Sequence, residues 1–385
     1  MLAASRTLLY NYVFFMNRPL HVVQLLPALN EGGVERGVVE MNRELVRRGV
    51  RSTIISAGGK LAPFIERDGG THVTLDVKSK NIFTALSRAK KLRRALQELA
   101  PDVVHIRSRV PGWLTRFAKP EAPVVTTVHG FNSVSPYSAI MTRGERVICG
   151  STFMLDWIKA KYNTPESIIR LIPRGIDPEQ FDPAKIDPVS VASLRAYHGL
   201  DGHFVVLGLG RITSWKGYDT LIQALALTNL PQLKVVIVGG VQQGQEAHAE
   251  SLKKLAHELG VAERVVFVGS QSNVAEWYAA ADVLVSCAFK KPETFGRSMT
   301  EALAMERPVV AARHGGALDI VRDGVNGFFF TPGDAAELAE KLVALQGRSW
   351  QGLREDALAR FSLAQMVDKT LAVYHEVAIN KFQKG

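Results

Sequence analysis

Several features that direct a protein to a metal site, an oxidising compartment or a membrane are missing or rare in this sequence. Its 385 residues include two cysteines, Cys149 and Cys287, which lie far apart and match no metal-ligand spacing. This argues against a disulfide framework and favours buried free thiols in a reducing compartment. The apolar stretch at residues 8–15 is too short to span a bilayer, and Asn11 interrupts it. No small-residue cleavage site follows, so residues 1–15 are interpreted as an upstream extension or a loose tail that contacts a membrane.

Two common nucleotide-binding signatures are also absent. GLGRIT (208–213) lacks the third glycine of G-x-G-x-x-G, and GGVERG (32–37) has the wrong spacing. No glycine loop is followed by the lysine–serine pair of a P-loop. Hydride transfer with a dinucleotide and P-loop chemistry are therefore disfavoured.

Positive charge is in excess, and it is unevenly distributed. The net charge is +10; residues 1–183 contain 26 Lys+Arg and 16 Asp+Glu, whereas residues 184–385 contain 21 of each. The whole excess thus lies in the first half. This asymmetry favours an anionic surface or polymer as a partner of that half.

Short apolar runs rich in valine and isoleucine alternate with segments of helical periodicity. In the first half the predicted strands are residues 21–27, 51–56, 71–75, 102–106, 123–128 and 146–150. The pattern then restarts, with predicted strands at residues 203–210, 233–240, 264–269, 282–287 and 307–312. Continuous apolar strands separated by helices indicate parallel sheets covered on both faces. The expected fold class is α/β, with two Rossmann-like domains facing each other across a cleft.

The boundary between the halves is predicted from composition. Residues 177–190 are rich in proline and aspartate and show little periodicity, as expected of a linker. We therefore predict an N-terminal domain over residues 1–183 and a second domain over residues 184–362. An amphipathic helix in the last segment, residues 363–385, is predicted to pack back on the N-terminal domain.

KPETFGRSMTEALAM (291–305) carries two carboxylates, Glu293 and Glu301, around a turn that leads into a helix. The peptide N–H groups of residues 294–297 would lie at an uncapped helix start, which binds anions and hydroxyl oxygens. Carboxylates also accept hydrogen bonds from the vicinal hydroxyls of a sugar or a ribose. The two acids can therefore hold two rings with a phosphate linker between them. An ordinary surface loop with a solvated Glu293 would show the same pattern.

LGLGRITSWKGYDTLIQAL (207–225) reads as a strand, a turn that carries Arg211 and Lys216, and a helix. Two cations near the carboxyl end of a strand suit a diphosphate, because α/β sheets bind ligands at that edge. A pair of surface cations is the plainer interpretation. Their position in the same half as Glu293 favours the diphosphate clamp.

Two motifs in the first half are also expected at the carboxyl edge of a sheet, where ligands bind. NEGGVERG (30–37) follows the first strand, and Gly32 and Gly33 let the backbone approach a phosphate closely before a helix begins. VTTVHGF (125–131) places His129 at a strand end, where it can hydrogen-bond a sugar hydroxyl or a leaving phosphate. A tight turn without ligand and a structural histidine are the alternatives.

In combination these motifs resemble the retaining glycosyltransferases of the GT-B fold in the family called GT4, or group 1. The resemblance spans about residues 17–380 and rests on seven motifs in order: GGVER, VHGF, IPRGID, GRITSWKG, VVFVG, PETFGRSMTEALAM and RPVVAARHGGALDIV. The glutamate-x7-glutamate spacing of Glu293 and Glu301 matches the family signature. The sequence departs from the family pattern at Thr294 and Glu306, where glycine is usual. A threonine at position 294 is expected to alter which hydroxyl of the donor sugar is recognised.

The resemblance implies roles for the residues of the second half, as a nucleotide-sugar donor domain. Arg211 and Lys216 would hold the donor diphosphate, Glu293 would face the transferred sugar, and Glu301 would bind the nucleotide ribose. The backbone groups next to Glu293 would complete the donor site, at Thr294, Phe295, Gly296 and Arg297. No bound metal is implied, because the two cations and the helix dipole neutralise the leaving group.

The first half is implied to be the acceptor side. Gly32 and Gly33 would meet the diphosphate, and His129 would lie near the reacting sugar carbon. Arg107, Ser108 and Arg109 follow the strand DVVHI and are predicted to meet a phosphorylated or acidic acceptor.

The implied activity is transfer of a sugar, with retention of configuration, from a nucleotide-diphosphate donor to a hydroxyl of a glycan or lipid-linked acceptor. Cell-envelope polysaccharide or lipopolysaccharide synthesis is the expected setting. A nucleotide-sugar epimerase on the same fold is an alternative, and would act on donor without acceptor. A non-catalytic basic protein that binds a polyanion is another, but it leaves the diphosphate clamp unexplained.

A basic segment, KSKNIFTALSRAKKLRRALQELA (78–100), is predicted to be an amphipathic helix. Its apolar face would bury Ile82, Leu86, Ala89, Leu92 and Leu96, with Phe83 on or near that side. The opposite face carries Lys80, Lys90, Lys91 and Arg94. Since it has one aromatic residue, nucleic acid is not an expected partner. Peripheral contact with an anionic membrane is expected, with a cytoplasmic location at the inner face of that membrane. A helix face exposed only to solvent would show the same sequence pattern.

Overall fold

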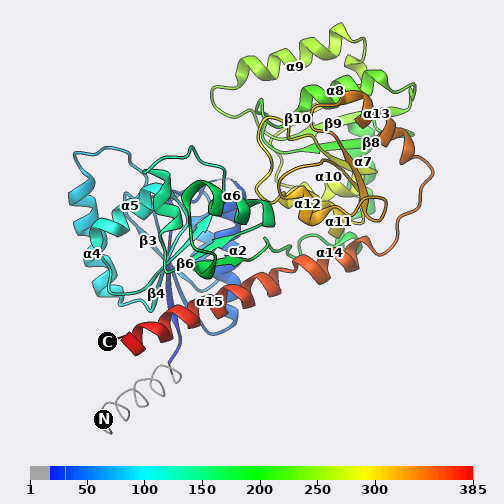
Figure 1. Ribbon diagram of the computed structural model, residues 1–385. Coiled ribbons are helices and arrows are strands. Elements are labelled where there is room, and N and C mark those ends of the chain that lie inside the picture. The colour runs from blue at the N-terminus through cyan, green and yellow to red at the C-terminus, as the bar shows by residue number, and fades with distance from the viewer. Residues whose placement is uncertain (1–17, 31, 385) are drawn as a thin grey trace. The chain divides into compact units, whose positions relative to one another are not determined.

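The computed structural model describes residues 18–30 and 32–384, so the extension predicted at residues 1–15 lies outside it. The chain forms two compact units (Figure 1). Unit 1 comprises the chain up to Pro173 together with the segment from Ala364 onward, and unit 2 comprises Arg174–Leu363. Each unit is built around one parallel sheet.

The sheet of unit 1 has seven strands in the order β3-β2-β1-β4-β5-β6-β7. Its strands are β1 (His21–Leu25), β2 (Arg51–Ser56), β3 (Thr71–Thr74), β4 (Val103–Ile106), β5 (Val124–Val128), β6 (Arg146–Cys149) and β7 (Ile169–Leu171). The helices of this unit are α2 (Gly33–Arg47), α3 (Ala62–Arg67), α4 (Ala85–Leu99), α5 (Arg109–Ala118), α6 (Thr152–Tyr162) and α15 (Leu363–Lys384). Ile54 and Ile55 are neighbours on β2 but belong to different core clusters. Successive strand residues therefore bury opposite faces.

Unit 2 has six strands in the order β10-β9-β8-β11-β12-β13. They are β8 (Phe204–Leu209), β9 (Leu233–Val238), β10 (Val265–Gly269), β11 (Val283–Ser286), β12 (Val309–Ala312) and β13 (Gly327–Phe330). Its helices are α7 (Pro188–Tyr197), α8 (Tyr218–Leu227), α9 (Glu246–Glu258), α10 (Val274–Ala280), α11 (Arg297–Ala304), α12 (Ala317–Ile320), α13 (Ala335–Ala344) and α14 (Leu353–Phe361). On β8, Val205 and Leu207 pack in one core cluster and Val206 in the other. The two faces of the sheet are thus both buried.

All strands predicted from the sequence are confirmed, and the two sheets are parallel throughout, as expected. Two short edge strands, β7 and β13, were not predicted. Both cysteines are buried and free, as expected from their spacing. No helix in residues 18–30 and 32–384 is both long and apolar enough to cross a bilayer.

The segment predicted as a linker contributes to unit 2 instead. Phe181 is buried in its core, and the Arg354 guanidinium donates to the Pro178 carbonyl over 3.1 Å. Asp187 accepts hydrogen bonds from the first turn of α7, which therefore begins at Pro188. The unit boundary after Pro173 consequently precedes the predicted boundary after residue 183.

The predicted helix over residues 78–100 begins later than expected. The Asn81 side chain accepts from the Phe83 N–H over 2.9 Å, and Arg88 donates to the Ser79 carbonyl over 2.8 Å. These bonds hold residues 79–84 in a turn, and α4 starts at Ala85. The placement of Ile82, Phe83 and Leu86 on the buried face was wrong, because all three are exposed.

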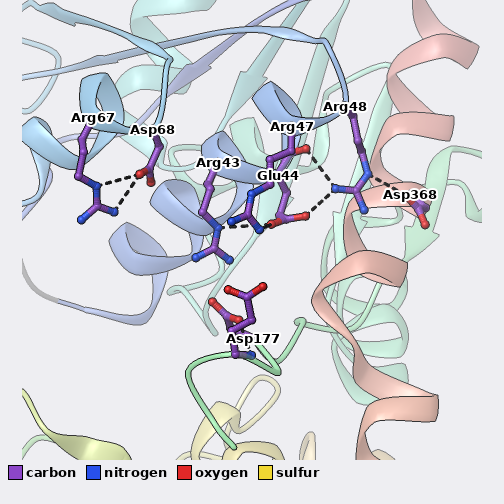
Figure 2. A network of polar contacts seen from close by, with 9 residues as sticks. Arg43, Glu44, Arg47, Arg48, Arg67, Asp68, Asp177 and Asp368 are labelled. Carbon is purple, nitrogen blue, oxygen red and sulfur yellow. Dashed lines mark hydrogen bonds and ion pairs between the residues drawn. The ribbon is translucent and has the colours of Figure 1, made fainter. Parts of the chain in front are cut away.

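The last helix, α15, is held to unit 1 by polar contacts. Figure 2 shows Arg48, at the end of α2, donating to Asp368 of α15 over 3.1 Å. The same guanidinium donates to Glu44 over 2.6 Å. Farther along α15, the Glu376 carboxylate accepts from Arg146 over 2.5 Å and from Arg170 over 2.7 Å. Residues far apart in sequence are thereby joined.

We predict that Glu376→Gln lowers the free energy of unfolding by about 1 kcal/mol at neutral pH, because it removes a charge shared by two arginines. The hydrogen bond from Arg146 lowers the pKa of Glu376 below its ordinary value of 4.5. The stabilisation is therefore complete above that value and is lost as the pH falls through the lowered folded-state pKa. Urea unfolding of both proteins at neutral pH and near pH 3 checks this. Glu166→Gln, which removes a more exposed ion pair with Lys159, is the control. If Glu376→Gln lowers the free energy of unfolding equally at both pH values, the prediction is contradicted.

Candidate active site

The order of strands reverses once in each sheet, between β1 and β4 in unit 1 and between β8 and β11 in unit 2. The loops that follow these strands leave the sheet in opposite directions and open a crevice at its carboxyl edge. In unit 1 these loops carry Gly32 and Arg107, and in unit 2 they carry Arg211 and Glu293. The structure thus gathers the predicted residues into two groups, one at the switch point of each sheet.

In unit 2, Lys216 and Glu293 form an ion pair. The two side chains retain only 18% and 16% of their exposure, so the pair is largely shielded from water. The Lys216 ammonium also lies 4.9 Å from the centre of the Trp215 ring, within the range of a cation–π contact. The residue predicted to hold the diphosphate and the one predicted to face the sugar are therefore neighbours.

The turn that carries Lys216 is locked to the end of β11. Gly217 has φ +70°, and a Cβ there would lie 2.0 Å from the Cys287 carbonyl oxygen, so this position requires glycine. The Tyr218 hydroxyl donates to the Gly210 carbonyl over 2.8 Å. Burial and the charge of Glu293 raise the pKa of Tyr218, which keeps this hydroxyl a neutral donor.

Arg211 differs from Lys216 in its surroundings. It is exposed at the end of β8, and no other residue of the described chain makes a hydrogen bond or ion pair with it. Its five donors are therefore available to an anion at the carboxyl edge.

Glu301 lies in the middle of α11, one turn after Arg297. Its side chain is buried; the Tyr278 hydroxyl donates to Oε2 over 3.0 Å and the Arg297 guanidinium to Oε1 over 3.2 Å. Two donors thus orient the carboxylate. Tyr278 was missed by the sequence analysis, because it lies in an unremarkable apolar segment, VAEWYAA, whose contact with α11 is tertiary.

The predicted backbone donors lie where α11 begins. Gly296 is the N-cap, with φ +106°, and no side chain caps the helix. Phe295 is buried and packs edge-on against Phe361, with ring centres 5.6 Å apart, so only its backbone can meet a ligand. Thr294 is half-buried beside it.

The following glycine pair supports this loop. The Gly316 N–H donates to the Glu293 carbonyl over 2.8 Å. A Cβ at Gly316 would lie 2.2 Å from the Phe295 carbonyl oxygen. The motif RHGGALDIV therefore acts by packing closely under PETFG.

In unit 1, α2 begins at Gly33 without a side-chain cap, and its N-cap Gly32 has φ +147°, which favours glycine. The N-terminal N–H groups of α2 are thus presented after β1, as the sequence predicted.

The remaining predicted residues of unit 1 share one pocket of about 280 Å³. It lies beyond the carboxyl ends of β1, β4 and β5 and is lined in part by Glu35, Arg107, Ser108, Arg109, His129 and Asn132. His129 and the three acceptor candidates, separate in sequence, are therefore brought together.

Comparison with known proteins bears on the meaning of this arrangement. Residues 192–346 match the family described as Glycosyl transferases group 1, and residues 31–180 match Glycosyltransferase Family 4. A D-inositol 3-phosphate glycosyltransferase of Catenulispora acidiphila is 31% identical over 386 residues, covering 89% of this chain and 90% of the relative.

Solved structures of glycosyltransferases are similar to this chain as well. A glycosyltransferase from Rickettsia africae has 29% identity and a TM-score of 0.85, and the match covers 93% of this chain and 98% of that one. HepE of Anabaena, in a complex with UDP and glucose, has 24% identity and a TM-score of 0.79, with 91% and 98% covered. The second likeness is one of fold. The chain therefore belongs to the group 1 glycosyltransferases and is a GT4-like enzyme with the GT-B fold.

Proposed function

We propose that this glycosyltransferase moves a sugar, with retention of configuration, from a nucleotide-diphosphate donor to a hydroxyl of a glycan or lipid-linked acceptor in cell-envelope polysaccharide or lipopolysaccharide synthesis. The observation that carries the proposal is the Lys216–Glu293 ion pair beside an exposed Arg211 at the switch point of unit 2. The UDP complex of the HepE structure supports a nucleotide-linked donor.

The charges account for how the donor would be held. A diphosphate at this edge takes hydrogen bonds from Arg211 and Lys216, and the N–H groups at the start of α11 add their dipole. When Lys216 turns to the diphosphate, Glu293 is released to accept hydrogen bonds from hydroxyls of the transferred sugar. Because the cations already neutralise the leaving group, the proposal requires no metal.

The nucleotide end would lie on Glu301. Its oxygens accept hydrogen bonds from Tyr278 and Arg297, and a carboxylate can accept several hydrogen bonds at once, including those from ribose hydroxyls. Tyr278 and Arg297 hold the carboxylate for this contact.

The transfer step exchanges one bond at the anomeric carbon for another. The bond from that carbon to the diphosphate oxygen breaks, and a bond to the acceptor oxygen forms on the same face. The departing phosphate oxygen takes the proton of the acceptor hydroxyl. Arg211 and Lys216 stabilise the negative charge that develops on the diphosphate. His129 is proposed to hydrogen-bond the sugar near the reacting carbon, and Gly32 and Gly33 to meet the diphosphate.

Contact with a membrane is proposed for the start of α4. Three large apolar side chains stand in solvent there: Ile82 is 76% exposed, Phe83 92% and Leu86 73%. We name these three residues the apolar tip. Exposed cations flank it on both sides in the sequence, at Lys78, Lys80, Lys90 and Lys91.

An apolar tip flanked in the sequence by exposed lysines suits an anionic bilayer at the inner face of the cytoplasmic membrane. The tip can enter the headgroup region, and each cation near the surface contributes about 1 kcal/mol. Such attachment would place unit 1 beside lipid-linked acceptors.

The donor site is tested first by thermal unfolding with a panel of uridine, guanosine, adenosine and cytidine diphosphate sugars. A ligand at 100 times its dissociation constant adds about 2.7 kcal/mol and raises the midpoint by a few degrees. We expect a clear response to one nucleotide, abolished in Glu301→Ala and retained in Glu340→Ala, which removes an exposed acid on α13. A flat panel for the unaltered protein would contradict the proposed function.

Lys216→Ala is expected to reduce turnover at least about a hundredfold, since one electrostatic contact to the charge that develops in the transition state contributes about this factor to the rate. The measurement is release of nucleoside diphosphate from the donor that the panel identifies. Lys290→Ala, an exposed lysine after β11, is the matched control and should keep normal turnover. Near-normal turnover of Lys216→Ala would refute its catalytic role.

Membrane contact is tested by co-sedimentation with phosphatidylglycerol-containing vesicles and with neutral phosphatidylcholine vesicles. Phe83→Ser is expected to weaken binding to the anionic vesicles about thirtyfold, because burying a phenylalanine contributes about 2 kcal/mol. Tyr197→Ser, which alters a side chain that is 85% exposed on unit 2, should bind normally. Equal binding of the unaltered protein to both vesicles would refute the contact.

A further inference from the structure

Arg107 is a buried cation whose hydrogen-bond partners carry no charge. Its side chain is nearly inaccessible, with the residue only 7% exposed. Its guanidinium donates to the Gln24 Oε1 atom from Nε over 3.2 Å and from Nη2 over 2.6 Å, and it also contacts the Tyr374 hydroxyl. Within residues 18–30 and 32–384, no carboxylate forms an ion pair with it. A buried charge normally requires a counter-charge, so this one is unusual.

The groups around Arg107 stay neutral. Burial raises the pKa of Tyr374 to about 12. His105 bridges Tyr374 and the Thr127 hydroxyl, and burial lowers the pKa of His105 well below its ordinary value, with Arg107 acting in the same direction. The network therefore orients Arg107 but leaves its positive charge uncompensated.

Arg109 is a second guanidinium in the same pocket. Its Nη1 donates to the Ser138 hydroxyl over 3.2 Å, and its guanidinium carbon lies 5.4 Å from the centre of the Tyr137 ring. Neither partner is an acid. Both arginines line the 280 Å³ pocket. Its volume is just below the range of about 300–1,000 Å³ that is common for small-molecule sites.

The start of α5 adds to this positive field. Ser108 is its N-cap, but the Ser108 side chain makes no capping hydrogen bond, and Ser108 and Arg109 both face the pocket. The first N–H groups of this ten-residue helix therefore bring the positive end of its dipole there. The pocket also contains one acid, Glu35, which is not bonded to Arg107.

From these observations we propose that the pocket of unit 1 binds an anionic oxygen group, phosphate or carboxylate, on the sugar acceptor, with Arg107 and Arg109 as its ligands. A guanidinium presents paired N–H donors, which match the paired oxygens of a phosphate or a carboxylate. The acceptor is then an anionic sugar or sugar phosphate, free or attached to a lipid. This inference rests on the proposed function, since it names the acceptor class of that reaction.

Binding to three probes tests the inference: glucose 6-phosphate, glucuronate and neutral glucose, each titrated calorimetrically into the full chain. We expect at least one anionic probe to bind, more weakly as salt increases, and glucose to bind at least about tenfold less tightly. Preference between the two anions identifies phosphate or carboxylate. Glucose binding as tightly as the anions, or no binding of either anion, would overturn the proposal.

Arg109→Gln tests the proposed contact between the pocket and the anionic group. Arg109 is chosen because it is only half-buried, so replacing it threatens folding less than replacing the buried Arg107. Affinity for the anionic probe should fall about tenfold or more. Arg116→Gln, an exposed arginine on the same helix, should leave affinity unchanged. Unchanged affinity in Arg109→Gln would overturn the proposal.

The nucleotide panel separates this inference from the proposed function. If a nucleotide sugar binds and no anionic probe does, the anion subsite is refuted while the donor assignment stands. If an anionic probe binds and the nucleotide panel is flat, the donor assignment is refuted while the anion site stands.

Discussion

The reversal of strand order in each parallel sheet is the constraint on which the site residues depend. Parallel strands buried on both faces must be joined by crossovers, and these run in opposite directions on the two sides of the reversal. Only at that point do two neighbouring loops diverge at the carboxyl edge. In unit 2 the reversal places Arg211 and Glu293 on adjoining loops, and in unit 1 it does so for Gly32 and Arg107.

Electrostatic balance differs between the two units. In unit 2 the partly shielded charges neutralise each other, as in the Lys216–Glu293 pair and the Arg297 contact to Glu301. Such pairs can exchange partners when a charged ligand arrives, since each group gains a new contact as it loses the old one. In unit 1 the buried Arg107 is held by uncharged groups alone. A ligand there would supply the missing counter-charge.

Close backbone packing positions these charges. Gly217 is fitted against the Cys287 carbonyl and Gly316 against the Phe295 backbone, so neither turn accepts a side chain. Glu306, where the family usually has glycine, adopts φ +59° after the end of α11. A left-handed conformation costs a residue with a Cβ about 1–2 kcal/mol, which explains why glycine is common at this position.

The sequence by itself determined the parallel α/β class, the position of nearly every strand and the glutamate pair of α11, because periodicity and spacing are local properties of the chain. It also identified Arg107 and Arg109 as neighbours at a strand end. Only the tertiary structure decided which charges have partners: the contact of Tyr278 with Glu301 and that of Tyr374 with His105 join segments distant in sequence. The exposure of Phe83 was likewise decided by a turn that no helical periodicity describes. Burial and pairing depend on contacts across the fold, and these are absent from any local pattern.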